Sequence, residues 1–267
     1  MNRIWFAGLL CVSCTPSPKT NEVVLATTTS TRDSGLLDSL LPAFESTSGY
    51  KVKVVAVGTG QAIAMARRGD AQIVLVHAPE IERAEVDSGN FVRRRLVMHN
   101  DFLFVGPATD PAKLRGLHDP VAALKTIAQA RAPFVSRGDR SGTHIFEQKL
   151  WKLAELAPPE PGGWYVEAGQ GMAATLQMAD EKHAYTITDR GTFLAWQSKL
   201  ELVPSVEGDT LFYNVYHVME VPDAGAGARA LADFFVSAEA QEFIGRFGTT
   251  RFGRPLFVPD AGQPDRW

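Results

Sequence analysis

Short apolar runs alternate along this chain with longer stretches in which apolar residues recur every three or four positions. The runs at residues 23–26, 51–57 and 73–76 are typical of β-strands, and 51–57 (KVKVVAV) also alternates polar and apolar side chains. Residues 36–44 carry apolar side chains at helical spacing, and Gly49 follows them. Repeated strand–loop–helix units predict an α/β fold with mostly parallel sheets flanked by helices.

The same alternation continues through the rest of the chain. Predicted strands at 101–106, 134–135, 184–188 and 211–221 alternate with predicted helices at 61–68, 121–130, 144–156, 172–181, 191–197 and 224–247. We expect two lobes, with the chain crossing between them near residues 101–107 and again near 210–215. Residues 23–104 plus 213–267 would form lobe I, with residues 105–212 inserted as lobe II. A ligand cleft is expected between the lobes, because ligands of α/β proteins bind beyond the carboxyl ends of strands.

The first fourteen residues differ from the rest of the chain. Asn2 and Arg3 precede an uncharged apolar stretch at residues 4–12. That stretch is too short to span a bilayer, which takes about twenty residues. The pattern predicts an export signal over residues 1–14.

The predicted signal ends at a cysteine. Residues 10–14 (LCVSC) resemble a bacterial lipoprotein cleavage box, although Cys11 stands where that pattern prefers leucine. We favour lipidation of Cys14, with a cleaved signal that carries no lipid as the alternative. Residues 15–22 (TPSPKTNE) are polar and contain two prolines, which predicts a tether to the folded body.

Composition narrows the classes of function. Apolar residues make up 45% of the chain and charged residues 21%, which excludes a disordered protein. A formal net charge of -3 argues against a dedicated nucleic-acid-binding protein, so any strong attraction for anions must be local. The 2 cysteines lie close together and the 6 histidines are scattered, which excludes a disulfide framework and a multi-cysteine zinc site. We expect no protein-bound metal cation and no cofactor.

Small and hydroxyl-bearing residues gather where four helices are predicted to begin. These stretches are residues 27–30 (TTTS), 58–60 (GTG), 137–143 (RGDRSGT) and 169–172 (GQGM). One explanation is N-capping, in which Ser, Thr or Asp side chains accept hydrogen bonds from the first amides of a helix. The other is anion binding, because helix N-termini present free N–H groups and a partial positive charge, and glycine permits close approach. Four such stretches on two lobes favour a cage of hydrogen-bond donors.

Arg137 adds a cation to this set of donors. A guanidinium group makes charge-assisted hydrogen bonds of fixed geometry to an oxyanion. An ion pair with Asp139 is the alternative role for Arg137. Arg140 is interpreted as an exposed charge at the start of a helix.

These stretches together resemble the tungstate-binding proteins of the TupA type, which are solute-binding components of ABC importers. The resemblance is carried, in order, by residues 26–36 (ATTTSTRDSGL), 57–60 (VGTG), 75–79 (LVHAP), 136–144 (SRGDRSGTH) and 185–192 (YTITDRGT). It covers residues 23–247 and leaves out the signal region and the C-terminal tail.

The resemblance implies a type II periplasmic-binding-protein fold, in which two α/β lobes close on a tetrahedral oxyanion. It also implies an exported protein without enzymatic activity, which delivers its ligand to a membrane permease and its ATPase. Membrane contact is then expected only through the N-terminal lipid, and no nucleic-acid partner is expected. The residues that match the family's binding loops are Thr28, Ser30, Thr59, Val76 (through its backbone), Arg137, Ser141 and Thr143, and helix position adds Gly171 and Met172.

Tungstate is the ligand that the resemblance indicates, with molybdate, sulfate and phosphate as alternatives. The first three carry no proton near neutral pH, so a site made of donors alone suits each of them. Phosphate keeps a proton and favours a site with a carboxylate acceptor. Asp139 could be that acceptor, but pairing with Arg137 is the favoured role.

Other classes of function find no support in the sequence motifs. The chain has no Gly-x-Ser-x-Gly elbow, no His-Glu-x-x-His helix and no Walker A loop. The histidines lack the spacing of metal ligands. A ligand-sensing transcription regulator would need a helix-turn-helix segment and a cytosolic start, and the leading residues offer neither.

Overall fold

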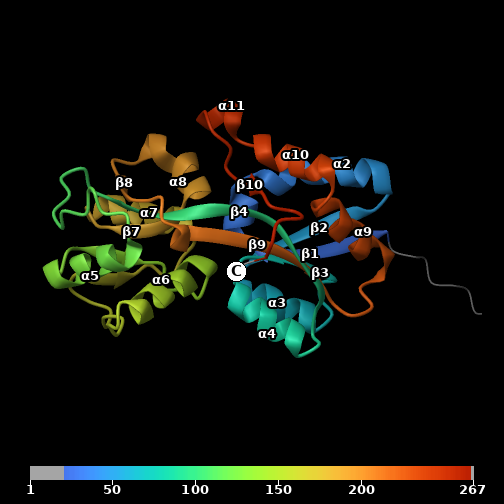
Figure 1. The fold of residues 1–267 in the computed structure, drawn as a ribbon, viewed down its shortest axis with the longest axis horizontal. Coiled ribbons are helices and arrows are strands. Elements are labelled where there is room, and N and C mark those ends of the chain that lie inside the picture. Colours follow the sequence, from blue (N-terminus) through green and yellow to red (C-terminus); the bar gives the residue numbers. More distant parts are fainter. Residues whose placement is uncertain (1–20, 266–267) are drawn as a thin grey trace, which may run out of the picture.

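Two lobes lie side by side in the computed structural model, which describes residues 21–265 (Figure 1). The strands β4 (Val92–Gly106) and β9 (Tyr213–Glu220) cross the junction between the lobes. The predicted signal, Cys14 and residues 15–20 of the predicted tether lie outside the described residues. The first strand, β1 (Glu22–Thr28), begins at the last residue predicted for that tether.

Lobe I is a sheet with helices on both faces. Besides β1, β9 and the first part of β4, its strands are β2 (Lys51–Val57), β3 (Ile73–Val76) and β10 (Val258–Pro259). Its helices are α1 (Thr29–Asp33), α2 (Leu36–Ser48), α3 (Thr59–Arg67), α4 (Pro79–Asp87), α9 (Gly225–Phe235), α10 (Ala238–Arg246) and α11 (Thr249–Phe252).

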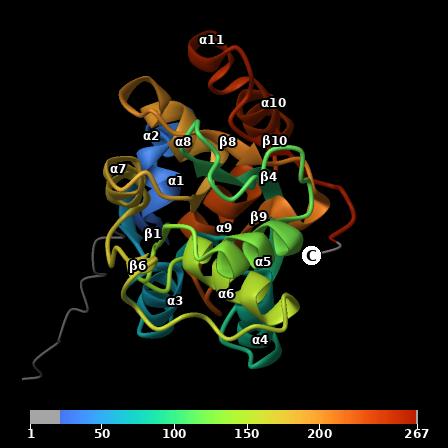
Figure 2. The same ribbon diagram turned by 90° about the vertical axis from the view of Figure 1, so that its left-hand side faces the viewer.

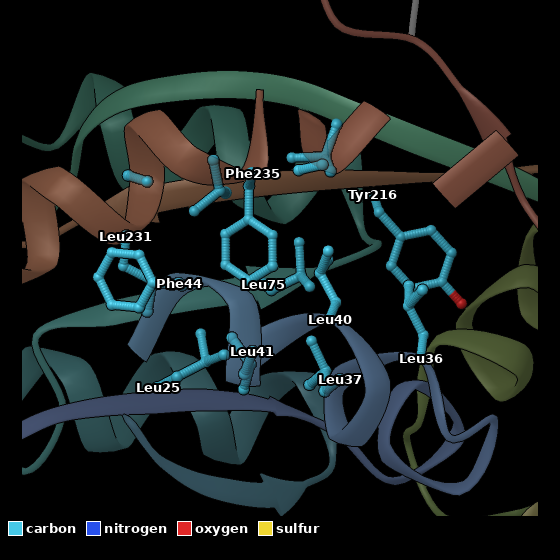
Figure 3. Close-up of a cluster of buried hydrophobic side chains, with 14 of the residues drawn as sticks. Leu25, Leu36, Leu37, Leu40, Leu41, Phe44, Leu75, Tyr216, Leu231 and Phe235 are labelled. Atoms are coloured by element: carbon cyan, nitrogen blue, oxygen red, sulfur yellow. The ribbon is translucent and has the colours of Figure 1, made fainter. Parts of the chain in front are cut away.

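Alternating side chains of the lobe I strands supply two hydrophobic cores. Leu25 and Leu75 face α2, α9 and α10, whereas Ala26 and Val74 face α3. Figure 3 shows the first core, where leucines of α2 pack beneath Phe235 of α9. Burying an apolar side chain of this size contributes about 1.5–3 kcal/mol, so the two layers hold the sheet firmly in place.

Lobe II has the same layered construction. Its strands are the second part of β4, β5 (Phe134–Ser136), β6 (Tyr165–Glu167), β7 (Thr186–Asp189) and β8 (Val203–Val206). Its helices are α5 (Pro120–Ala130), α6 (Gly142–Leu153), α7 (Met172–Glu181) and α8 (Arg190–Trp196), and the short 3₁₀ turns are η1 (Gln197–Lys199) and η2 (Thr210–Phe212). Phe102 and Phe104 of β4 pack against α5 and α6, and Leu103 and Val105 pack against α7 and α8. Figure 2 looks onto lobe II, with α5 and α6 in front.

The two-lobed α/β architecture is confirmed, but the expectation of mostly parallel sheets needs correction. In lobe I, β2, β1 and β3 are parallel, whereas β9 is antiparallel to both β3 and β4. In lobe II, β5 and β6 are parallel, whereas β4 is antiparallel to β7 and β8. The sheets are mixed because β4 carries the chain into lobe II and β9 carries it back, so these neighbouring strands must run in opposite directions.

Parallel pairing in lobe I brings the loops after three strands to one edge of the sheet. Thr28 lies opposite Val57, and Thr27 lies opposite Leu75. The chain therefore leaves β1, β2 and β3 at the same level, on the side that faces lobe II. Within residues 21–265, no helix combines the length and apolar character needed to cross a membrane.

The lobe I core predicts the effect of a cavity. Leu40 of α2 is 1% exposed, so Leu40→Ala should lower the free energy of unfolding by about 2–5 kcal/mol, because the lost contacts leave a partly unfilled space. Denaturant unfolding followed by circular dichroism measures the change. The control is Leu156→Ala, at a leucine that is 40% exposed, which should stay within about 0.5 kcal/mol of the parent chain. Equal losses in the two variants would contradict this account of the core.

Candidate functional site

The hydroxyl-rich stretch after β1 forms a compact cluster at the sheet edge. Thr28 is the N-cap residue of α1, and its Oγ1 accepts a hydrogen bond from the Thr31 amide. The same oxygen lies 3.2 Å from Ser30 Oγ and 2.7 Å from Thr31 Oγ1. All three side chains are buried. Thr28 and Ser30 are thus held together at the start of a helix, as the sequence predicted.

Two further predicted residues lie on the same edge. Thr59 opens α3 directly after β2, and its buried Oγ1 has no hydrogen-bond partner among the described residues. Val76 ends β3, and its side chain is part of the core beneath α3. Thr59 therefore offers a free hydroxyl group, whereas Val76 can offer only its backbone.

Arg137 connects the two lobes at the cleft. It follows β5 of lobe II, is 4% exposed, and donates from Nη2 to Thr29 Oγ1 of lobe I at 3.3 Å. Its Nε donates to the carbonyl oxygen of Gln170 at 3.2 Å, just before α7. Its Nη2 also lies 2.9 Å from Asp139 Oδ2, which confirms the predicted ion pair. The guanidinium group thus has a fixed position between α1, α6 and α7.

The start of α6 forms the lobe II side of the site. Ser141 is the N-cap residue, and its Oγ accepts from the His144 amide at 3.4 Å. Thr143 is buried in the first turn. Gly142 lies directly against the imidazole ring of His77, which follows β3, and a Cβ atom on Gly142 would overlap that ring. The N-terminus of α6 therefore touches the strand end of lobe I.

The stretch before α7 contributes less than the other three. Gly171 is the N-cap residue and is exposed, so its backbone is accessible. The side chain of Met172 is 3% exposed and belongs to the lobe II core. Met172 can therefore reach a ligand only through its backbone amide.

Four polar residues of the cleft were missed by the sequence analysis. Asp189, at the end of β7, is buried and caps α8 by accepting from the Thr192 amide and hydroxyl group at 2.9 and 2.7 Å. Burial raises the pKa of Asp189, while hydrogen bonds from Thr192 and the positive charge of Arg137 act in the opposite direction. The other three are His77, Asn214 and Tyr216.

His77, Asn214 and Tyr216 form one buried network. His77 Nδ1 lies 2.6 Å from Asn214 Oδ1, and the His77 ring stacks on Tyr216 with 4.7 Å between centroids. The Asn214 amide donates to the Tyr216 hydroxyl group at 3.0 Å. His77 follows a strand end and lies in a stretch that the sequence analysis singled out, whereas Asn214 and Tyr216 look like ordinary strand residues.

A groove opens on the α4 side of this network. It has a volume of about 760 Å³ and lies between α4 and α6, with His77, Gly142 and Asn214 at its inner end. Thr28, Ser30, Thr59 and Arg137 do not line it, so the groove does not contain the hydroxyl cluster. Within residues 21–265, no three His, Cys, Asp or Glu side chains lie close enough to hold a metal ion. The donors described above suit an anion.

His77 predicts how stability depends on pH. Burial lowers the pKa of His77 to about 4, so the neutral ring is favoured by folding. This contribution is present above the unfolded pKa of about 6.5 and is lost as the pH falls through about 4. Between pH 7 and pH 4 the parent chain should lose about 3 kcal/mol more stability than His77→Gln.

Denaturant unfolding at several pH values measures this difference in slope. His118→Gln, at an exposed histidine, is the matched control and should keep the acid sensitivity of the parent chain. A His77→Gln variant with an unchanged pH slope would show that the buried ring does not carry the effect.

Comparisons with known proteins agree with this architecture. Residues 15–239 match the family described as the PBP superfamily domain. The tungstate-binding protein TupA of Peptoclostridium acidaminophilum is 47% identical over 250 residues, covering 91% of this chain and 87% of the relative.

Two solved structures each match this chain with a TM-score of 0.77. The tungstate-binding protein TupA of Desulfovibrio alaskensis G20 is 42% identical and covers 90% of this chain and 99% of its own. A protein described as the tungstate ABC transporter from Geobacter sulfurreducens is 44% identical, and the match covers 85% of this chain and 98% of its own. The chain therefore belongs to the PBP superfamily and, within it, to the TupA family.

Proposed function

We propose that this protein is the extracytoplasmic solute-binding component of an ABC importer and that it captures tungstate. The observation that carries the proposal is the convergence of hydrogen-bond donors from both lobes, with Arg137 reaching Thr29 across the cleft. Family members described as tungstate-binding proteins support the choice of ligand. The protein binds its ligand without transforming it and is not an enzyme.

Each proposed contact donates a hydrogen bond to an oxygen atom of the anion. From lobe I these are the hydroxyl groups of Thr28, Ser30 and Thr59 and the backbone at Val76. From lobe II they are the guanidinium group of Arg137, the hydroxyl groups of Ser141 and Thr143, and the backbone at Gly171 and Met172. Because every contact is to oxygen, no protein atom ligates the metal itself.

Capping a helix and binding an anion are compatible roles for these hydroxyl groups. Ser141 Oγ accepts a hydrogen bond from the helix amide, and its own proton remains free to be donated. Hydrogen bonds to charged groups contribute about 1.5–3 kcal/mol each. Five to eight of them, less the cost of ordering the lobes, reach the roughly 12 kcal/mol of a nanomolar complex.

The position of Asp139 favours a fully deprotonated anion. Its Oδ2 pairs with Arg137, and its Oδ1 accepts from the Ser141 amide at 3.0 Å. Both oxygens therefore already orient the binding loop, which makes Asp139 a poorer acceptor for hydrogen phosphate. Tungstate, molybdate and sulfate all fit this pattern of donors, so the choice of tungstate relies on the relatives.

We further propose that the described fold follows an export signal at residues 1–14 and that Cys14 carries a lipid. Residues 23–104 plus 213–267 and residues 105–212 would then act as two lobes that close on the ligand. A permease subunit and its ATPase would receive the anion. Mass spectrometry of the protein extracted from membranes tests the anchor, because a diacylglycerol on Cys14 adds a defined mass to the first peptide.

Calorimetry with a panel of tetrahedral anions tests the proposed ligand. We expect tight binding of tungstate, with sulfate and phosphate weaker by roughly a hundredfold or more, because a cage whose fixed radius suits the larger anion disfavours both smaller ones. The molybdate arm measures the selectivity between the two larger anions. Tighter binding of phosphate than of tungstate would overturn the proposed function.

Arg137→Ala should weaken tungstate binding by roughly a hundredfold or more, because a buried cation that donates to the anion is lost. The control is Arg246→Ala, which removes an exposed arginine far from the cleft and should leave affinity unchanged. Circular dichroism of both variants should match the parent chain. An Arg137→Ala variant with parental affinity would remove Arg137 from the binding site.

A further inference from the structure

The hydrogen bonds of Asn214 fix the tautomer of His77. The Asn214 amide nitrogen donates to Asn100 Oδ1 at 2.7 Å and to the Tyr216 hydroxyl group at 3.0 Å. Its carbonyl oxygen is therefore the atom that faces His77 Nδ1 at 2.6 Å. An oxygen acceptor there requires a proton on Nδ1, so in the neutral ring Nε2 carries the lone pair.

His77 Nε2 is a buried polar atom without a partner among the described residues. The ring edge that carries it lies against Gly142, in the first turn of α6, where Nε2 is 2.9 Å from the position a Cβ atom would take. Helix amides in this turn have no partner within the helix and are available to an anion. His77 Nε2 therefore adds a hydrogen-bond acceptor beside the first turn of α6, which otherwise offers hydrogen-bond donors.

The charged groups that act on the His77 ring and on Tyr216 leave no unpaired positive charge for a dianion. The positive charge of Arg137 acts on the His77 ring, but Arg137 is already paired with Asp139. Asp189 adds a buried carboxyl group whose charge acts on Tyr216, against the other side of the ring. The charged groups that line the groove are Glu80 and Arg83 of α4 and Lys149 and Lys152 of α6.

We propose that His77 Nε2 contacts the bound oxyanion and that one proton is taken up with the anion, held between Nε2 and the nearest anion oxygen. The inference rests on the proposed function and concerns the same site. A lone pair on Nε2 would repel the anion oxygen, whereas a shared proton converts that contact into a charge-assisted hydrogen bond. Hydrogen phosphate would bring its own proton, so its binding would take up none.

The direction of the pH effect follows from burial. Burial lowers the pKa of His77 to about 4, so the ring is neutral at pH 6.5 before the anion binds. A neighbouring dianion raises that pKa, because it favours the charged ring. Affinity is therefore highest at low pH and falls as the pH rises towards the pKa of the complex, by up to about tenfold per pH unit for one linked proton.

Titration calorimetry with tungstate at pH 6.5, in buffers of different ionisation enthalpy, counts the protons. We expect uptake of about one proton per anion by the parent chain, and a dissociation constant that rises between pH 6.5 and pH 8. His77→Gln places an amide N–H near Nε2, so binding should persist with uptake near zero and little dependence on pH. His118→Gln, the control at an exposed histidine, should keep the uptake of the parent chain.

The outcomes separate the two proposals. Tungstate binding to the parent chain without proton uptake would overturn the role of His77 and leave the proposed function intact. Absence of tungstate binding would overturn the proposed function itself, and the inference with it. If His77→Gln does not fold, nitrogen NMR of the parent imidazole decides the matter. A new proton at Nε2 in the complex supports the inference, and an unchanged neutral ring contradicts it.

Discussion

A small dianion can be held away from water only by many donors in fixed positions, and the proposed site obtains them where several helices start at one place. The parallel strands β1, β2 and β3 end at one edge of a sheet, so the helix starts after β1 and β2 and the backbone after β3 lie side by side. Lobe II brings the first turn of α6 against the same edge, where Gly142 lies on His77. The amides and hydroxyl groups are thus oriented by the sheets and helices themselves, which lowers the entropy lost on binding.

Much of this arrangement could be predicted from the sequence. The strands at residues 51–57 and 73–76 and the helix at residues 172–181 have the bounds that periodicity indicated, because each is strongly patterned and ends at a glycine or a polar residue. Helix α4 was missed because five of its nine residues are charged and it leaves only a short apolar face. The first part of β4 was missed because three consecutive arginines hide its alternation.

Some residues of the candidate site could likewise be recognised from the sequence, whereas others could not. Stretches that begin helices can be recognised locally. The helix starts contain Thr28, Ser30, Thr59, Ser141 and Thr143, and Arg137 lies in the loop that leads from β5 to α6. Asn214 and Tyr216 could not be found in this way, because their role comes from contacts with residues more than a hundred positions away in sequence. Met172 shows the opposite case, since its place in the sequence indicated a ligand contact while its side chain completes the lobe II core.

Because the proposed donors belong to two lobes, we expect anion binding and lobe closure to be coupled. An anion that contacts only one lobe gains about half of the available hydrogen bonds, so the closed arrangement is favoured only by an anion large enough to reach both sets at once. The radius of the cage then selects among anions by deciding whether the lobes close, in addition to how well each donor fits the anion. Arg137 is well placed to set that radius, because Asp139 holds it from lobe II while its Nη2 donates to Thr29 of lobe I. A partner that binds only the closed arrangement of the lobes would therefore respond to the size of the anion without contacting the anion itself.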